Sequence, residues 1–217
     1  MTRRAGIRSV LSFPSVFRVY QRAVGARNLK RSIIDRHLRP RSGDRLLDIG
    51  CGPGDLVDDL PDVGIEYVGL DVSGQYIEYA RARFGERGSF LVADVLDADA
   101  DALGTFDLVH AHGLLHHLDD AVASRACALA AKVLVPSGRF VTADPCFHPD
   151  QSRLARFTVS RDRGQAVRTP DRYCALAEQS FARVDVLVDQ SPLRIPHTTA
   201  VLVCAEPELQ ARHLAGT

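Results

Sequence analysis

The stretch RLLDIGCGPG at positions 45–54 places a short apolar run directly before three glycines at alternate positions. The run 45–49 has the length and apolar character of a strand buried on both faces. Glycine lets the backbone turn sharply and approach a ligand closely at the carboxyl end of such a strand. The stretch therefore predicts a strand followed by a ligand-binding turn, with Gly50, Cys51 and Gly52 at the ligand.

Short apolar runs alternate with helical patterns beyond this turn. Further strands buried on both faces are predicted at 67–70, 90–93, 106–111 and 139–143. Helices are predicted near 56–60, with an amide end towards the turn, and at 75–84 and 121–134. The Pro-Ser-Gly sequence at 136–138 is expected to stop the last helix and form a turn. This alternation predicts right-handed crossovers and a parallel sheet.

The end of the chain breaks the alternation. A predicted helix at 171–180 is followed by two strand-like runs, 184–188 and 199–204, with no helix between them. The linker 189–197 carries Pro192 and Pro196, which exclude a helical crossover. The two runs should therefore pair as an antiparallel hairpin at one sheet edge. The predicted fold class is α/β: a doubly wound, Rossmann-like sheet with one reversed strand, preceded by an N-terminal helix around 16–29.

Composition narrows the classes of partner. Lys+Arg and Asp+Glu both total 27, so no net charge attracts nucleic acid or an anionic membrane. No apolar run approaches the roughly 20 residues that span a bilayer. The five cysteines are scattered without C-x-x-C spacing, which argues against disulfides and a zinc site. We therefore expect a cytoplasmic protein with no nucleic-acid or membrane partner, and the oligomeric state stays open.

Acidic residues around the turn discriminate between two ligands. Asp71 closes the second strand about 20 residues beyond the turn, where this fold places a ribose-binding acid. Dinucleotide sites prefer G-x-G-x-x-G, whereas here the glycines follow G-x-G-x-G and Asp55 takes the place of the last glycine. Asp48, just before the turn, would repel a pyrophosphate but suits an amino group and a sulfonium. The pattern favours S-adenosylmethionine over NAD.

Six segments also resemble a known family, class I S-adenosylmethionine-dependent methyltransferases of the small-molecule type. Residues 48–54 resemble its motif I, and 106–110 its motif IV. The segments 68–73, 92–95, 114–118 and 134–140 resemble other parts of the family in order and spacing. Together they span about 100 residues, 45–144. The resemblance implies a seven-stranded sheet, which the hairpin inferred above fits.

The resemblance also implies roles in binding S-adenosylmethionine. Each aspartate has an alternative role as a cap or turn residue. The methionine part would lie near Asp48, Gly50, Cys51 and Gly52, the ribose on Asp71, the adenine amino group on Asp94, the adenine ring between Val72 and Val95, and the sulfonium beside His110.

A cluster of histidines follows the fourth predicted strand. His112 and His116 have i, i+4 spacing, but no carboxylate completes a set of metal ligands, so no metal site is predicted. Methyl transfer is an in-line displacement that depends mainly on positioning. An acceptor hydroxyl or ammonium must still lose a proton, so His116, His117 and His148 are candidate catalytic bases. A purely structural role is equally compatible with each of them.

Residues 1–217 are expected to form one domain: an N-terminal helical lid segment (1–40), a cofactor-binding core (44–144), a lid insertion over the acceptor (145–170), and a C-terminal helix and hairpin (171–205). The insertion carries five arginines that either recognise an acceptor carboxylate or phosphate or lie on a solvated helix at 152–160. The expected function is methyl transfer from S-adenosylmethionine to a small-molecule oxygen or nitrogen. The alternatives are a non-catalytic S-adenosylmethionine-binding sensor and an NAD-dependent oxidoreductase.

Overall fold

The structure is a computed structural model that describes residues 26–162, 164, 166–190 and 196–208. Its centre is a seven-stranded sheet in the order β3-β2-β1-β4-β5-β7-β6. The strands are β1 (Arg45–Ile49), β2 (Glu66–Asp71), β3 (Gly88–Val92), β4 (Phe106–His112), β5 (Leu134–Pro145), β6 (Phe181–Asp189) and β7 (Thr199–Pro207).

The strand directions divide the sheet into two parts. β1 pairs in parallel with β2 and β4, and β3 and β5 extend this parallel part on either side. β7 is antiparallel to both β5 and β6, and it lies between them. This confirms the predicted doubly wound sheet and its reversed terminal hairpin.

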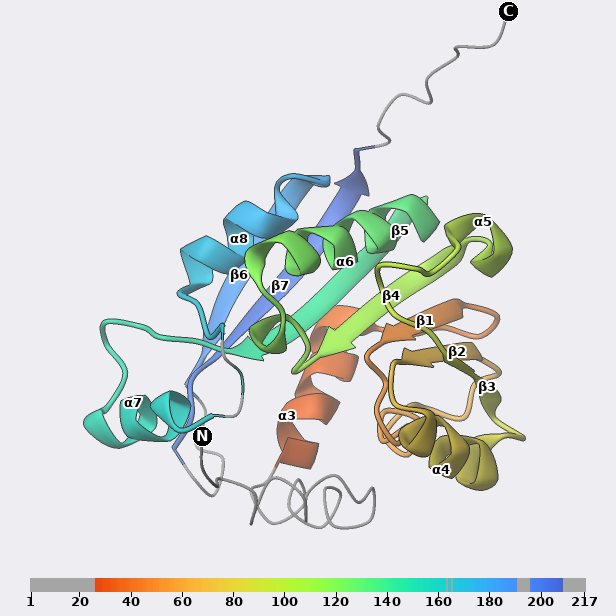
Figure 1. Cartoon of the computed structure of the whole chain (residues 1–217), viewed down its shortest axis with the longest axis horizontal. Helices are drawn as coiled ribbons and strands as arrows, with labels where there is room; N and C mark the ends of the chain where they lie inside the picture. The colour runs from red at the N-terminus through yellow and green to blue at the C-terminus, as the bar shows by residue number, and fades with distance from the viewer. Residues whose placement is uncertain (1–25, 163, 165, 191–195, 209–217) are drawn as a thin grey trace, which may run out of the picture.

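Helices cover both faces of the sheet (Figure 1). The helical elements are α3 (Ala26–Ile33) with its π-helical end η1 (Ile34–Leu38), α4 (Gly74–Phe84), α5 (Ala100–Leu103), the 3-10 turn η2 (Leu115–His117), α6 (Asp120–Val133), α7 (Arg153–Ser160) and α8 (Pro170–Ala177). One apolar cluster joins a sheet face to η1, α4 and residues 56–60, and the other joins the opposite face to α6 and α8. Neighbours on β1 divide between them, because successive side chains point to opposite faces: Leu46 belongs to the first cluster and Leu47 to the second.

The segment between β1 and β2 differs from the prediction. Residues 52–59 form successive turns, so the helix expected near 56–60 is wrong. Val57 donates a backbone hydrogen bond to Gly54 (3.1 Å), and Leu60 donates one to Leu56 (3.1 Å). Only six residues separate Gly54 from Pro61, too short a run for a stable helix between two residues that interrupt helices.

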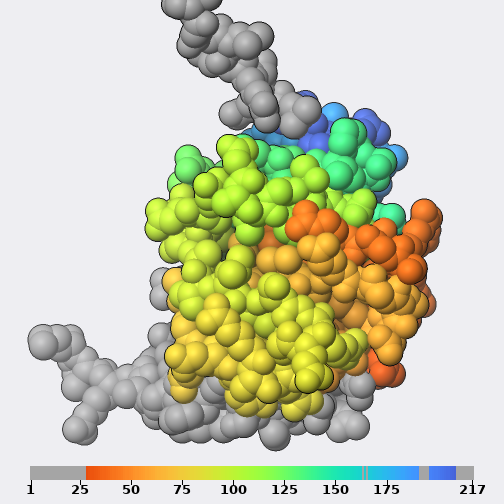
Figure 2. All heavy atoms as spheres, turned by 90° about the vertical axis from the view of Figure 1, so that its right-hand side faces the viewer, coloured from red at the N-terminus to blue at the C-terminus, as the bar shows by residue number. Residues whose placement is uncertain are grey.

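The strand predicted at 90–93 is buried on one side only. In β3, Phe90 is buried, whereas Leu91 and Val92 are 40% and 54% exposed. β3 is the last strand at its end of the sheet, next to β2. Figure 2 views this end from outside, with the orange-to-yellow residues of β2, α4 and β3 against the lime segment around α5. The expectation of burial on both faces is therefore wrong for this strand, because it lies at an edge.

The junction between α6 and β5 also differs from the prediction. β5 begins at Leu134, directly after α6, so residues 136–138 lie within the strand and do not separate helix from strand. The register with β4 shifts between Phe106 and Leu108, and the shift accommodates these residues. A Cβ at Gly138 would lie 2.7 Å from the Asp107 carbonyl oxygen, so glycine is needed for this close pairing.

The remaining helix predictions have mixed outcomes. The helix at 152–160 is confirmed as α7, and the helix at 171–180 is present but ends earlier, as α8. The predicted helix at 16–29 lies mostly outside the described residues, which begin with α3. Among the described residues, no helix combines the length and the apolar character that a membrane span requires.

Candidate functional site

A cavity of about 240 Å³ lies at the carboxyl ends of β1, β2 and β4. This is the edge where a doubly wound sheet binds its ligands. The cavity is lined by side chains and backbone from α3, the glycine turn, β2, α4 and the loop after β4: Lys30, Asp48, Gly50, Cys51, Gly52, Pro53, Asp55, Leu56, Asp71, Tyr76, His110, His112, Gly113, Leu114 and His117.

The glycine turn has the backbone that the sequence predicts. Gly50, Gly52 and Gly54 have φ of 72°, 55° and 77°, in the left-handed region that favours glycine. The amides of Gly50 and Cys51 both donate to the Leu70 carbonyl (2.8 and 2.9 Å), which ties the turn to β2. Turns and not a helix follow the glycines, so the helix that directly follows the glycine turn in dinucleotide sites, and whose amide end binds the pyrophosphate, is missing at this position.

Asp71 lies at the end of β2 beside the turn. Its Oδ2 accepts a hydrogen bond from the Gly52 amide (2.9 Å), and its Oδ1 accepts one from the Ser73 amide (2.8 Å). Burial raises the pKa of this carboxyl, and the two amide hydrogen bonds oppose the rise. Each carboxylate oxygen can accept further hydrogen bonds, so Asp71 can fix the turn and still bind a hydroxyl pair.

Asp48 joins three strands through a buried polar network. Its Oδ2 accepts from the Tyr67 hydroxyl (2.7 Å), and its Oδ1 lies 2.9 Å from His110 Nδ1. Asp48 and His110 are 3% and 2% exposed. The carboxylate therefore belongs to the floor of the cavity, where its charge is shared with two neighbours from β2 and β4.

Three residues predicted to bind adenine do not line this cavity. Val72 is 70% exposed, and Val95 packs partly against the core beneath α6. Asp94 is exposed, and its Oδ1 accepts from the Leu96 amide (2.9 Å), which is the turn role considered as its alternative. Asp94 follows the end of β3, and the Ala93 amide bonds to the Asp71 carbonyl (3.1 Å), so these residues continue the edge that carries Asp71.

His116 is held between two carboxylates. Its Nδ1 lies 2.8 Å from Asp144 Oδ1, and its Nε2 lies 3.1 Å from Asp162 Oδ1. Burial opposes a charged ring, but the hydrogen bonds to both aspartates outweigh it and raise the pKa of His116 to about 9. The same contact overcomes the effect of burial on Asp162 and lowers its pKa to about 2. At neutral pH His116 is a cation, and this arrangement favours a structural role for it.

The other two candidate bases lie in different surroundings. His117 is exposed, lines the cavity and contacts the His116 ring at 4.0 Å between centroids. His148 does not line the cavity. Its amide donates to Gln151 Oε1 (2.9 Å), and its Nδ1 accepts from the Asp150 amide (3.3 Å), within the loop after β5.

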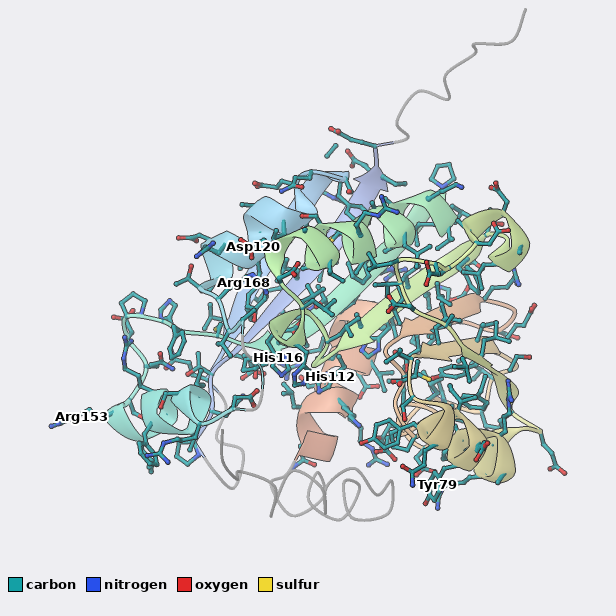
Figure 3. The ribbon with its side chains drawn as sticks, viewed as in Figure 1. Tyr79, His112, His116, Asp120, Arg153 and Arg168 are labelled. Atoms are coloured by element: carbon teal, nitrogen blue, oxygen red, sulfur yellow. The ribbon has the colours of Figure 1, made fainter. Side chains whose placement is uncertain are left out.

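The arginines of the insertion divide between two roles. Arg168 is 4% exposed: it pairs with Asp120 (2.7 Å) and donates to the carbonyls of Leu115 (2.8 Å) and Leu118 (2.7 Å). Figure 3 shows Arg168 beside Asp120, whereas Arg153 points outward from α7. Arg168 therefore fixes the insertion to the loop after β4, and its donors are already used. Arg163 lies outside the described residues.

Several residues that line the cavity were not predicted from the sequence, and two of them, Lys30 and His112, have basic side chains. Lys30 reaches the cavity from α3, and His112 reaches it from the end of β4. The spacing of His112 from His110 places both on one face of a strand, and this spacing is the signal in the sequence that could have found His112. Lys30 gives no local signal, because its position depends on where α3 packs. Within the described residues, no three His, Cys, Asp or Glu side chains converge as metal ligands do.

Comparisons with known proteins agree with this geometry. Residues 46–138 match a family described as a methyltransferase domain. O-methyltransferase cnsE of Penicillium expansum is 35% identical over 163 residues, which cover 69% of this chain and 56% of that protein. The ubiquinone biosynthesis O-methyltransferase of Xanthomonas axonopodis pv. citri (strain 306) is 33% identical over 110 residues, 49% of this chain and 44% of that protein. The chain thus spans about half the length of these relatives.

A solved structure shares the fold at low sequence identity. Phosphoethanolamine N-methyltransferase 2 of Haemonchus contortus, in complex with S-adenosyl-L-methionine, superposes with a TM-score of 0.70 and 15% identity, over 90% of this chain and 57% of that one. The sheet order, the glycine turn with its acidic partners and the matched domain all agree. The chain belongs to the class I S-adenosylmethionine-dependent methyltransferases.

Proposed function

We propose that the protein transfers the methyl group of S-adenosylmethionine to a hydroxyl of a small molecule. The observation that carries this proposal is the cavity at the glycine turn, which is lined by three carboxylates, Asp48, Asp55 and Asp71, and by the cation Lys30. S-adenosylmethionine offers a ribose diol, an ammonium and a sulfonium to carboxylates, and a carboxylate to a cation. The charges of the cavity complement this molecule, and the carboxylates of the cavity would repel a pyrophosphate.

The lining residues support one arrangement of the cofactor in this cavity. The ribose hydroxyls would bind Asp71, and the methionine part would lie against Gly50, Cys51 and Gly52 above Asp48, with its sulfonium towards His110. The methionine carboxylate would pair with Lys30. The adenine would extend towards Val72, Asp94 and Val95, outside the cavity but along the same edge of the sheet.

Oxygen is the proposed acceptor atom because the two relatives compared by sequence are both named O-methyltransferases. The fold alone does not select it, since an N-methyltransferase superposes as well. A hydroxyl must lose its proton during transfer. Of the three histidines predicted as bases, His117 lines the cavity, His116 is paired with two carboxylates, and His148 lies elsewhere.

The proposal is tested in two steps with the full chain. Calorimetric titration should show binding of S-adenosylhomocysteine and none of NADH at the same concentrations. Incubation with methyl-labelled S-adenosylmethionine and a panel of catechols, phenols and hydroxy acids should then give a labelled, extractable product. Tight binding of NADH alone contradicts the cofactor assignment. Binding of S-adenosylhomocysteine without methylation of any hydroxyl contradicts the O-methylation and favours the sensor function.

A further inference from the structure

His112 occupies the last position of β4, two residues beyond His110 on the same face of the strand. The two rings are stacked at 6.0 Å between centroids, with 15° between their planes. His110 is fixed by Asp48, as described above, whereas His112 lines the cavity beside the loop after β4. Figure 3 shows His112 close to His116 at this end of the strand. Asp48 on β1, His110 and His112 thus form a row of polar side chains. In the proposed arrangement, His112 is the member of this row next to the acceptor.

His110 and His116, the neighbours of His112, each have a carboxylate partner, whereas Nδ1 of His112 has no hydrogen-bond partner among the described residues. His110 Nδ1 contacts Asp48, and both ring nitrogens of His116 contact aspartates. His112 Nδ1 is shielded from solvent and has no hydrogen-bond partner among the described residues. A buried polar atom without a partner is unusual in a folded protein and is typical of functional positions. His112 can change its protonation state without breaking any ion pair that the structure describes.

The surroundings keep this ring neutral in the resting protein. An imidazolium needs an acceptor for each of its two N–H groups, and Nδ1 has none among the described residues. Burial and the charges or rings that face it (Lys30 from α3, His110 on β4, His116 from η2 and His197 before β7) hold the pKa of His112 well below its usual range. His116 contributes a full charge, because its two aspartates keep it protonated. A neutral histidine is a proton acceptor ready for use.

We propose that His112 is the general base that takes the proton of the acceptor hydroxyl, an assignment that rests on the O-methylation proposed above. The hydroxyl oxygen forms the new bond to the methyl carbon with its own electron pair, and the carbon–sulfur bond breaks with its pair going to sulfur. The O–H proton goes to the His112 ring. Positive charge therefore leaves the sulfur as it appears on the imidazole, so the cavity gains no net charge.

The charge balance explains how a ring that faces the cations Lys30 and His116 can accept a proton at this step. A sulfonium in the cavity disfavours the charged form of His112 before transfer, and its neutral thioether product removes that opposition afterwards. His117 also lines the cavity, but it is exposed and its ring packs on the His116 ring, whereas Nδ1 of His112 is shielded from solvent. The geometry therefore assigns the base to His112, a residue outside the three that the sequence predicted.

Nuclear magnetic resonance of the full chain with labelled histidine tests the assignment without an acceptor. The variant H112Q identifies the His112 signals, and H37Q serves as the matched control because His37 lies in η1 and not at the cavity. The His112 ring should be neutral at pH 7.5 with S-adenosylhomocysteine bound, and its chemical shifts should change when S-adenosylmethionine replaces it, since the two differ by one charge. A protonated ring, or one that does not respond to this exchange, overturns the proposal.

Steady-state kinetics with a hydroxyl acceptor from the panel tests whether His112 takes part in the methyl transfer. H112Q should lower kcat by about 10²-fold or more, the usual effect of removing a general base, and leave the affinity for S-adenosylhomocysteine within about threefold. Its residual rate should rise with pH as the acceptor ionises by itself, whereas H37Q should keep the activity of the parent protein. H112N serves as a second variant if H112Q fails to bind S-adenosylhomocysteine.

The outcomes separate the two proposals. A kcat that H112Q and H112N leave unchanged, or a larger loss of kcat in H117Q than in H112Q, overturns the role of His112. If no acceptor of the panel is methylated although S-adenosylhomocysteine binds, the O-methylation fails, and the magnetic resonance measurement still decides whether His112 responds to the charge on sulfur.

Discussion

The glycines of the turn share a positive φ but need it for different reasons. A Cβ at Gly54 would lie 3.0 Å from Phe84 and 3.1 Å from Phe90, so this position has no room beneath α4 and β3. A Cβ at Gly52 would meet no atom within 4 Å, and this residue lines the cavity. Gly54 is therefore required for packing, whereas the proposed role of Gly52 is to let the ligand reach the backbone.

Alanine substitutions should separate these roles. G54A should lower the free energy of unfolding by about 2–4 kcal/mol, from left-handed strain together with crowding. G52A should cost only about 1–2 kcal/mol of strain, but it should weaken S-adenosylhomocysteine binding at least tenfold. G43A is the matched control, because Gly43 also has a positive φ and open space but lies away from the cavity. Urea unfolding and calorimetry measure both effects; equal affinities in G52A and G43A would contradict the proposed contact.

Asp71 should be the strongest polar determinant of cofactor affinity. D71N keeps the shape of the side chain but removes its charge. It also replaces one carboxylate oxygen, which accepts from the Gly52 or Ser73 amide, with an NH₂ group that cannot accept. We expect the Kd for S-adenosylhomocysteine to rise about 10²-fold, since hydrogen bonds to a charged group are worth about 1.5–3 kcal/mol each. D94N should raise it less, because Asp94 is exposed. A larger effect of D94N in the same titration would argue against the ribose placement.

At the scale of elements, the insertion after β5 is fixed to the loop after β4 by two cations. His116 joins that loop to Asp144 on β5 and to Asp162 after α7, and the Ala166 amide donates to its carbonyl (3.0 Å). Arg168 makes a second attachment a few residues later, through Asp120 and the carbonyls of Leu115 and Leu118. Ion pairs and hydrogen bonds thus hold the insertion at these two points.

The His116 attachment should depend on pH. The pKa of His116 is raised to about 9 in the folded protein, so its contribution is complete below about pH 6.5 and is lost as the pH rises through 9. The depressed pKa of Asp162, about 2, keeps that carboxylate charged throughout this range. H116Q should be less stable than the parent by on the order of 2 kcal/mol at pH 6, and the difference should shrink by pH 9.5. Thermal unfolding at several pH values, with H117Q as the control, measures it; a difference that grows with pH would refute the assignment.

Arg168 and Arg172 offer a matched pair at one carboxylate. Both bind Asp120, but Arg168 is 4% exposed at its side chain and Arg172 is 68% exposed. R168M should cost about 2–4 kcal/mol of unfolding free energy, because the buried carbonyls of Leu115 and Leu118 lose their donors. R172M should cost less than about 1 kcal/mol. Similar losses in urea unfolding would show that burial does not set the strength of this attachment.

At the scale of the whole molecule, ligand binding should appear as stabilisation. S-adenosylhomocysteine at about 100 times its Kd should add roughly 2.7 kcal/mol to the free energy of unfolding. For a chain of this size, that corresponds to a Tm increase of about 5–10 °C. NADH at the same concentration should leave Tm unchanged, and G52A should lose most of the response to S-adenosylhomocysteine. A rise in Tm with NADH alone would overturn the cofactor assignment.

The sequence alone was sufficient for the sheet, the glycine turn and the acids beside it. These features depend on local rules: burial on both faces makes a strand apolar throughout, glycine permits a positive φ, and Pro192 and Pro196 exclude a helical crossover. The same rules failed where tertiary neighbours determine the local conformation or the burial of a segment. Residues 52–59 form turns although their pattern suits a helix, and β3 is half-exposed because it lies at a sheet edge.

Only the tertiary structure distinguished the roles of the histidines and arginines. His110, His112, His116 and His117 are alike as a sequence pattern. Folding brings Asp48 to His110, and it brings Asp144 and Asp162 to His116, from distant positions in the chain. Lys30 likewise enters the cavity only through the packing of α3. The glycine turn and its neighbouring acids could be predicted because the backbone conformation is encoded locally. Which side chain holds a proton depends on charges brought together by folding, and no local pattern contains them.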